Sequence, residues 1–203
     1  MKSQLELFTQ VDEHLLLDDK PSNYLNEISE DVNFKKYPFG YLYKLKNTEQ
    51  SPKYHPEGSA WNHTMLVVDE AAKVKDKSKN KRAFMWASLL HDIGKPSTTK
   101  KKKGRIISYN HDKIGAELVV DFLRQFKQEE EFTRQVRNLV YYHMHILYVL
   151  KGLPFADIPS MRDAVDIEEI ALLGYCDRMG RLHVDAKHEE KNIQEFKQKV
   201  ATR

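Results

Sequence analysis

The stretch Leu89-Leu90-His91-Asp92-Ile93-Gly94-Lys95-Pro96 organises the rest of the sequence. An apolar run, Ala83 to Leu90, ends in an adjacent histidine and aspartate, and both residue types are metal ligands. Neighbours on a helix point about 100° apart, so the two side chains reach one ion only near a helix end or a bend. Gly94 and Pro96 supply the bend, because glycine permits positive φ and the residue before proline leaves the helical region. A lone His-Asp pair is usually structural, so a metal site requires further ligands.

Composition excludes several classes of protein. The 203 residues carry a net charge of +3, so bulk charge implies no particular partner. No apolar run approaches the roughly 20 residues that a membrane-spanning helix needs, and residues 1–10 lack the pattern of a signal peptide. Cys176 is the only cysteine, which excludes a disulfide framework and a cysteine-based zinc site. These features predict a cytoplasmic protein with no membrane partner.

Apolar residues recur at helical spacing along most of the chain, which predicts an all-α bundle. After the first fifty residues, the expected helices span about 59–75, 82–92, 112–126, 129–150, 166–183 and 185–200. Two short helices before residue 30 form an N-terminal cap, residues 37–60 are irregular, and residues 97–110 form an irregular loop or a hairpin. We expect one domain over 1–203, with an N-terminal helical extension (1–50), a core (51–185) and a C-terminal helix (186–203).

Several imidazoles and carboxylates fall on or beside the inward faces of these apolar helices. They are His63, His91, Asp92, His111, His143 and Asp177. Any one of them reads most simply as a hydrogen-bonded core residue. Together they would cost several kcal/mol to bury unless something satisfies them, and a divalent ion does so. Nitrogen and oxygen ligands without thiolate favour manganese, iron, zinc, nickel or cobalt over calcium.

Positive charge follows this cluster. Lys95 lies one helical turn beyond Asp92, where it could hold a phosphate oxygen or stabilise a leaving group, although an ordinary exposed lysine fits equally well. The run Lys100 to Lys103 and Arg105 is either a solvated loop tip or an attractor for a phosphate-bearing ligand. His55 and Glu57 are expected either at the rim of a pocket or as surface residues before a helix. The chemistry predicted is hydrolysis at phosphorus.

The order of these ligands resembles the HD superfamily of metal-dependent phosphohydrolases, which is all-helical. His63, His91, Asp92 and Asp177 match the His, His-Asp and Asp of that pattern. His111 and His143 match the two further histidines of members that bind two metals, in which Asp92 would bridge the ions. The resemblance implies one or two divalent ions of manganese, iron, nickel, cobalt or zinc, with magnesium possible.

Longer blocks are similar to the HD domain attached to bacterial CCA-adding tRNA nucleotidyltransferases. They are His55-Pro56-Glu57-Gly58-Ser59-Ala60-Trp61-Asn62-His63-Thr64-Met65, His91-Asp92-Ile93-Gly94-Lys95-Pro96, Gly104-Arg105-Ile106, Asn110-His111-Asp112-Lys113-Ile114-Gly115-Ala116 and Tyr142-His143-Met144. The similarity runs from about residue 50 to 182. The first 50 residues lack a Gly-Ser followed by paired carboxylates, so we expect no CCA addition. Asn110 stands where related domains often carry glycine.

Three functions follow from this reading. The first is a phosphatase or 2′,3′-cyclic phosphodiesterase acting on a nucleotide, an RNA end or a related phosphoester, with catalytic roles for Asp92 and Lys95 and substrate contacts from Lys95, His55, Glu57 and Arg105. Its partners would be a phosphorylated small molecule or nucleotide, and possibly RNA. The second is a nucleotide- or RNA-binding module with a structural metal. The third is a di-iron oxygenase on the same ligand set.

Overall fold

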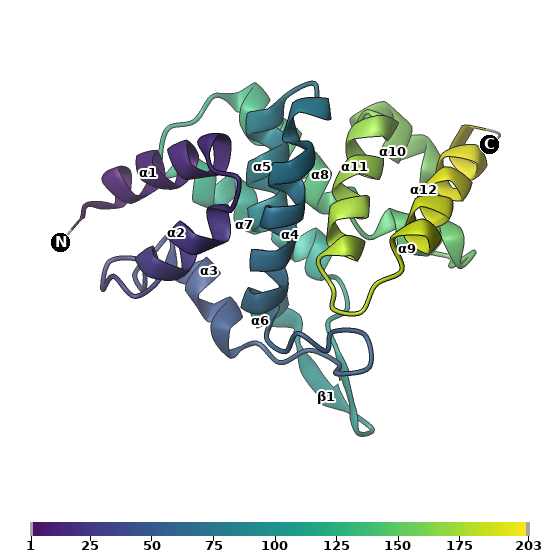
Figure 1. Ribbon diagram of the computed structural model, residues 1–203, viewed down its shortest axis with the longest axis horizontal. Helices are drawn as coiled ribbons and strands as arrows, with labels where there is room; N and C mark the ends of the chain where they lie inside the picture. The colour runs from purple at the N-terminus through teal and green to yellow at the C-terminus, as the bar shows by residue number, and fades with distance from the viewer. Residues whose placement is uncertain (1, 202–203) are drawn as a thin grey trace.

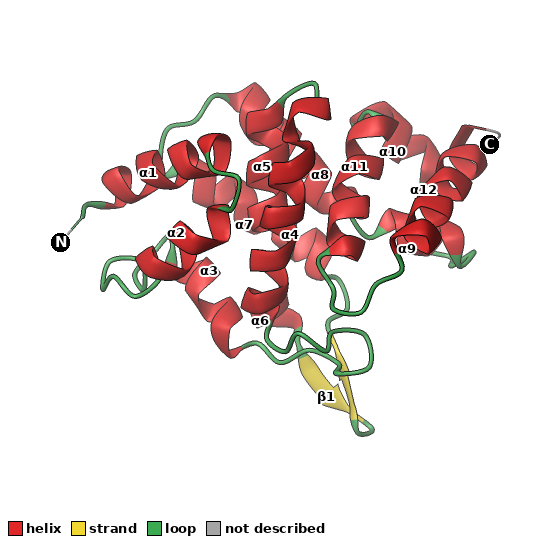
Figure 2. Cartoon of the chain, in the orientation of Figure 1, coloured by secondary structure: helices red, strands yellow, loops and turns green. Residues whose placement is uncertain are grey.

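The computed structural model describes residues 2–201, and helices make up most of it (Figures 1 and 2). The α-helices are α1 (Gln4–Leu17), α2 (Pro21–Ile28), α3 (Gly40–Tyr43), α4 (Ala60–Val74), α5 (Lys81–Leu90), α6 (Lys95–Thr98), α7 (His111–Arg124), α8 (Glu130–Tyr142), α9 (His145–Leu150), α10 (Ile158–Ala164), α11 (Ile167–Met179) and α12 (Ala186–Ala201). The shorter elements are the 3-10 helices η1 (Lys44–Asn47) and η2 (Lys75–Lys77) and the strands β1 (Lys100–Lys102) and β2 (Arg105–Ile107). The predicted all-α fold is confirmed. Within residues 2–201, no helix has the length and apolar character needed to cross a membrane.

Helix α5 lies at the centre, with α1, α4, α8 and α11 packed around it (Figure 1). Its residues from Ala83 to Leu90 are all buried. The helix begins where the Asn80 side chain accepts a hydrogen bond from the backbone N–H of Ala83, one of the donors that a helix start leaves without a partner. Because α5 is covered along its length, the His91 and Asp92 that follow its last turn also lie inside the molecule.

The two N-terminal helices cover one side of this core, as the apolar spacing predicts. The ring of Phe8 in α1 stacks on Trp86 of α5, with centroids 4.6 Å apart. The Asp12 carboxylate accepts hydrogen bonds from the Trp86 indole at 2.6 Å and from Arg82 at 2.8 Å. Buried Asp69 of α4 accepts from both the backbone N–H and the hydroxyl of Ser22 at the start of α2. These bonds tie both helices to the core.

Strands β1 and β2 form an antiparallel hairpin that projects from the helical body (Figures 1 and 2). This is the second of the two structures that the sequence allows for residues 97–110. Lys103 and Gly104 form its turn, with φ of 49° and 72°. Left-handed backbone at both central residues matches the twist of a two-residue hairpin loop. The hairpin lies between α6 and α7, so it is inserted between Lys95 and His111.

The prediction of one helix over 129–150 was wrong. The helix ends at Tyr142 and a new one, α9, begins at His145. At the break the Nδ1 of His143 lies 2.6 Å from the Val140 carbonyl oxygen, so the imidazole ring hydrogen-bonds to a carbonyl of the last turn. A side chain that satisfies a terminal carbonyl in this way allows a helix to stop.

Three smaller expectations also need correction. Residues 37–60, expected to be irregular, contain α3 and η1, and the loop expected before Pro159 contains the start of α10. The Asp157 side chain caps α10 by accepting from the N–H of Ser160, and Pro159 occupies the first turn, where its missing N–H costs nothing. Gly94 has φ −80°, so the bend after Asp92 uses no left-handed backbone.

Candidate metal centre

Five histidine rings form a continuous row through the interior. They come from the loop before α4 (His55), from α4 (His63), from the end of α5 (His91), from the end of α8 (His143) and from the start of α7 (His111). The centroids of successive rings are 4.7, 5.4, 5.5 and 5.1 Å apart. The structure therefore brings together all four histidines that the sequence proposes as ligands. His145 is also buried, but it lies outside this row.

Three of these rings are oriented in the same way, by hydrogen bonds from Nδ1 to backbone carbonyls three residues earlier. The bonds run from His91 to Ser88 (2.8 Å), from His143 to Val140 (2.6 Å) and from His111 to Ser108 (2.6 Å). A carbonyl only accepts, so Nδ1 carries the proton and Nε2 carries a lone pair. His91 and His143 each follow the last residue of a helix, where carbonyls lack intrahelical partners. Helix ends thus fix the tautomer that metal ligation requires.

Asp92 lies between two groups of these nitrogens. Its Oδ1 is 3.5 Å from His111 Nε2 and 4.0 Å from His143 Nε2, whereas its Oδ2 is 3.3 Å from His91 Nε2. Two ligand atoms that each lie about 2.1 Å from one ion are separated by roughly 3.0 to 3.4 Å. The distances from Oδ2 to His91 and from Oδ1 to His111 are close to this ligand spacing, whereas the distance from Oδ1 to His143 is longer. The two oxygens of Asp92 therefore face different histidines.

The interactions of the ring nitrogens indicate a cation. His111 Nε2 and His143 Nε2 face each other at 3.2 Å, although both carry lone pairs, and the buried His91 Nε2 has no hydrogen-bond partner in the described chain. Burial lowers the pKa of His111 to about 4 and lowers that of His143, so both rings are neutral near pH 7. Burial opposes ionisation of Asp92, yet His91 and Lys95 hold the pKa of its carboxyl well below the usual range. Converging lone pairs beside an ionised carboxylate fit a divalent transition metal.

The other end of the row is richer in carboxylate. His63 Nε2 lies 2.9 Å from Asp177 Oδ1, and its Nδ1 lies 3.0 Å from Glu57 Oε1. The same Glu57 oxygen is 2.8 Å from His55 Nδ1. The Glu57 side chain is only 2% exposed, so it lies behind His63 rather than on an open rim. This carboxylate-imidazole-carboxylate arrangement orients the His63 ring.

The cluster is most exposed at this end and less so at the other. The side chains of His55 and Asp177 are 15% and 13% exposed, and those of Lys95 and His111 are 10% and 8% exposed, against 2% or less for His63, His91 and Asp92. A ligand approaching from solvent therefore meets one of these outer pairs before the central residues.

Two cations flank the cluster. Lys95 is buried, with its Nζ 2.6 Å from Asp92 Oδ2 and also donating to Gln50 Oε1 at 2.6 Å. Arg181 lies one turn beyond Asp177, with Nη2 3.6 Å from Asp177 Oδ2. Sequence reasoning missed Gln50 and Arg181, since neither interrupts an apolar pattern. Arg105, predicted to bind substrate, lies exposed on β2, away from these contacts.

The sequence also matches a known protein family. A family model described as "HD domain" matches residues 60–171, which is more than half of the chain. The chain belongs to the HD domain family. The HD domain places it in a superfamily of metal-dependent phosphohydrolases, and the predicted resemblance is confirmed.

Relatives of this HD domain chain include several proteins described as "Multifunctional CCA protein". The one from Mannheimia succiniciproducens is 27% identical over 184 residues, which cover 87% of this chain and 43% of that protein. The one from Pasteurella multocida is 30% identical over 135 residues (66% and 31%), and the one from Halorhodospira halophila is 37% identical over 114 residues (54% and 25%). The chain thus spans less than half the length of the curated relatives it matches.

Proposed function

We propose that this protein is a metal-dependent phosphoric ester hydrolase acting on a nucleotide, an RNA end or a related phosphoester, including 2′,3′-cyclic phosphodiesters. The observation that carries the proposal is the convergence of three Nε2 lone pairs on the two oxygens of buried Asp92. Backbone carbonyls hold the rings in the tautomer that binds metal, so the centre is preorganised for ions rather than for a hydrogen-bond network alone.

The ligand assignment follows the two groups around Asp92. One ion would be held by His63, His91, Asp92 and Asp177, and a second by Asp92, His111 and His143. Manganese, iron, nickel, cobalt and zinc suit this donor set, and magnesium is allowed. Bound metal supplies a water of lowered pKa and positive charge beside the phosphate. In the reaction a water oxygen bonds to phosphorus, the ester P–O bond breaks, and the leaving oxygen takes up a proton.

The remaining residues bind and orient the substrate. Lys95 is assigned to bind the substrate phosphate, since Gln50 and Asp92 fix the position of its ammonium group. His55, at the exposed end of the row, is assigned a substrate contact, and Glu57 orients it through Nδ1. Arg105 is assigned a more distant contact on the hairpin. The cations Lys95 and Arg181 beside the centre favour an anionic ester over dioxygen as substrate.

A phosphoester panel tests the proposal. The protein is stripped of metal and assayed with p-nitrophenyl phosphate, its bis ester, 2′- and 3′-AMP, 2′,3′-cyclic AMP and deoxynucleoside triphosphates, with Mn²⁺, Ni²⁺, Co²⁺ or Mg²⁺ added in turn. We expect turnover of at least one ester that depends on metal, and its loss in Asp92→Ala.

The matched control is Asp69→Ala, which removes another buried carboxylate, one that holds α2 and lies outside the histidine row. It should lower stability but keep activity at a temperature where the variant is folded. Equal activity in Asp92→Ala and the parent protein would exclude the assigned centre. Turnover that consumes oxygen and requires iron would instead identify an oxygenase.

A further inference from the structure

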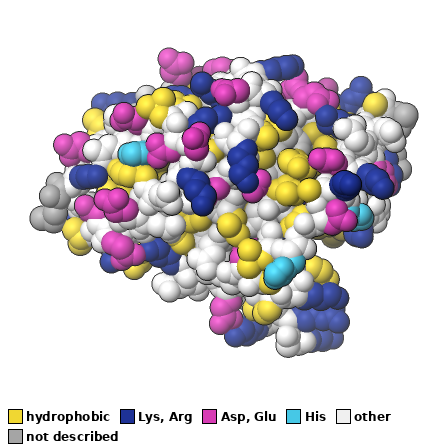
Figure 3. All heavy atoms as spheres, viewed as in Figure 1, with side chains coloured by type: hydrophobic (Ala, Val, Ile, Leu, Met, Phe, Trp, Pro, Cys, Tyr) yellow, Lys and Arg dark blue, Asp and Glu magenta, His cyan; other side chains and the backbone are white. Residues whose placement is uncertain are grey.

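The β1–β2 hairpin carries a dense positive charge. Its exposed cations are Lys100, Lys101, Lys102, Lys103 and Arg105. Among the ion pairs within residues 2–201, one carboxylate, Glu49, contacts the hairpin, through Lys101 at 2.8 Å. Figure 3 shows a contiguous group of Lys and Arg side chains on the lower projection of the molecule, where Figure 1 places the hairpin. The other cations of the hairpin are exposed and have no acidic partner in the part of the chain that the structure describes.

The positions of these charges destabilise the hairpin itself. Lys102 is the register partner of Arg105, and like charges directly opposite each other destabilise a strand pair. Lys103 has φ 49° at a turn position that asparagine or glycine normally occupies. The strands are only three residues long, so little backbone pairing offsets this repulsion. A bound polyanion would remove the repulsion.

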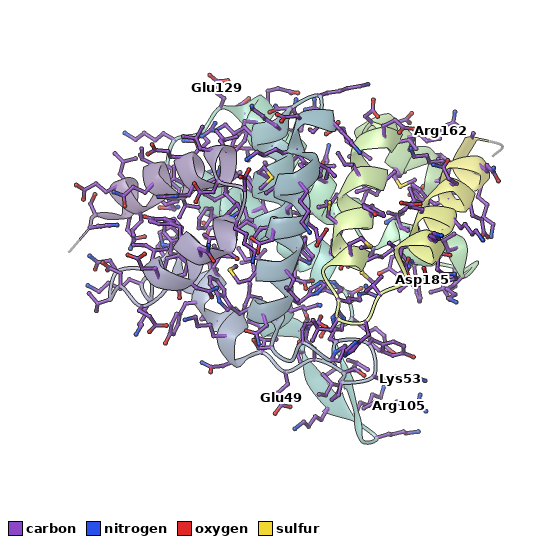
Figure 4. All side chains as sticks on the ribbon, viewed as in Figure 1. Glu49, Lys53, Arg105, Glu129, Arg162 and Asp185 are labelled. Carbon is purple, nitrogen blue, oxygen red and sulfur yellow. The ribbon has the colours of Figure 1, made fainter. Side chains whose placement is uncertain are left out.

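Exposed aromatic rings accompany the cations. Tyr109, two residues after β2, is 69% exposed, and Tyr54 is 60% exposed with Lys53 Nζ 5.4 Å from its ring centroid. The ion pair between Glu49 and Lys101 ties the loop that carries Tyr54 to the hairpin. Figure 4 shows Lys53 and Arg105 at the same side of the projection. Exposed aromatic rings among cations are typical of surfaces that bind unpaired bases and their phosphates.

Both ends of the hairpin are attached to the candidate metal centre. Lys95 begins α6, which leads into β1, and Ser108 after β2 accepts the hydrogen bond from His111 Nδ1. A hydrogen bond of 2.7 Å between the hydroxyls of Thr99 and Ser108 closes the base. Three residues of strand extend about 10 Å. A strand of nucleic acid lying along the hairpin would therefore have its end directed toward Lys95 and His111.

We propose that the hairpin, with Tyr54 and Tyr109, binds a single-stranded polynucleotide and presents its terminus to the metal centre. The cations contact phosphates and the tyrosines stack on bases. This rests on the proposed function for the identity of the centre, and among the substrates proposed there it selects the end of a single strand and assigns the surface that binds it.

Binding without turnover tests the surface separately from catalysis. Fluorescence anisotropy is measured in EDTA with labelled RNA and DNA strands of about ten nucleotides, and with a duplex, between about 50 and 200 mM salt. The variant Lys100→Ser/Lys102→Ser is compared with Lys187→Ser/Lys191→Ser, which removes the same charge from exposed lysines of α12. We expect the hairpin variant alone to bind single strands at least tenfold more weakly. The slope of log K against log salt should fall by about 1.4, because each phosphate contact contributes about 0.7.

A second variant tests stacking. Tyr54→Ala/Tyr109→Ala should weaken single-strand binding about tenfold, whereas Tyr37→Ala, which removes another exposed tyrosine, should not. Tighter binding of RNA or of DNA would identify the source of the strand. Equal affinities and slopes for the hairpin and α12 variants, or tighter binding of the duplex, would overturn the proposal. If the parent protein binds single strands as expected but hydrolyses no ester of the phosphoester panel, only the hydrolase assignment is contradicted.

Discussion

Gly94→Ala provides a test of how the centre is assembled. Gly94 has φ −80° and ψ −14°, which alanine adopts freely, so the substitution introduces no backbone strain of its own. An added Cβ, however, would lie 2.2 Å from the His111 carbonyl oxygen and 2.7 Å from the Gly115 nitrogen. Both obstacles are backbone atoms of the first turns of α7, so a side-chain rotation does not relieve the contact. The loop after Asp92 and α7 must move apart.

The magnitude follows from two opposing contributions. At a conformation alanine tolerates, a Gly→Ala change stabilises a protein by about 0.4 to 1 kcal/mol through the unfolded state. Overpacking of a buried contact typically costs about 1 to 3 kcal/mol, and a rigid backbone obstacle belongs at the upper end. With the cost near 3 kcal/mol, we therefore expect the free energy of unfolding to fall by about 2 to 2.6 kcal/mol. For a chain of this size that corresponds to a Tm roughly 4 to 10 °C lower, at 2 to 4 °C per kcal/mol.

Thermal unfolding followed by circular dichroism in EDTA measures this difference. The control is Gly152→Ala, where an added Cβ meets nothing within 4 Å but the backbone has φ 61°. The control should lose about 1 kcal/mol, which is the left-handed penalty of a residue with a Cβ. Because the clash displaces His111, Gly94→Ala should also weaken Mn²⁺ binding at least tenfold, and the control should not. A Gly94→Ala protein as stable as the control, with unchanged Mn²⁺ affinity, would refute the close packing of α7 against the His-Asp turn.

Three further predictions concern side chains around and beyond the centre. Glu57→Gln should weaken Mn²⁺ binding about 10- to 100-fold in a chelator competition, because the carboxylate that orients His63 is lost; an unchanged affinity would argue against that role. Lys95→Met should lower kcat/KM for an active ester about 100- to 1,000-fold while metal binding persists, as expected for a preorganised cation facing developing charge. Glu189→Gln should lower stability at pH 7 by about 1 kcal/mol. Burial opposes ionisation of Glu189, but Asn192 and Arg178 hold its pKa below the ordinary value of 4.5, so its contribution is present above that value and disappears as the pH falls. The difference in Tm between the two proteins should therefore close in acid.

Much of the fold follows from patterns that a single helix displays by itself. The apolar run that ends at Leu90 and the 3-4 spacing around His63 predict α5 and α4 to within a few residues. The break after Tyr142 does not follow, since the residues from 129 to 150 keep an apolar stripe throughout. Helix α8 ends where the imidazole of His143 hydrogen-bonds to the Val140 carbonyl. The helical periodicity of the sequence does not predict that bond.

The residues of the candidate site also fall into those that the sequence predicts and those that it does not. Imidazoles and carboxylates on apolar faces stand out because burying them is costly. Of the predicted set, His63, His91 and Asp92 form one cluster, and Asp92, His111 and His143 form another, while Asp177 lies against His63. Gln50 and Arg181 do not stand out, because both lie in polar surroundings in the sequence and reach the centre only when distant segments pack together. Asn110 shows an intermediate case. Its φ of 63° is one that glycine and asparagine both adopt readily. Asparagine therefore allows the left-handed backbone that precedes His111, although the sequence alone does not predict that conformation.

The contacts of Lys95 connect metal binding to substrate binding. Its ammonium group lies 2.6 Å from Asp92 Oδ2, the same oxygen that faces His91. Without a bound metal, Lys95 is one of the two groups, with His91, that hold the buried Asp92 carboxyl ionised, so its ammonium group is held beside Asp92. When Asp92 Oδ2 serves as a metal ligand, that need disappears, and Lys95 keeps only the hydrogen bond to Gln50. Lys95 then has N–H groups free to donate to a phosphate oxygen. Loading the centre should therefore raise its affinity for phosphate, and Gln50→Leu should reduce that gain by releasing the side chain from its position.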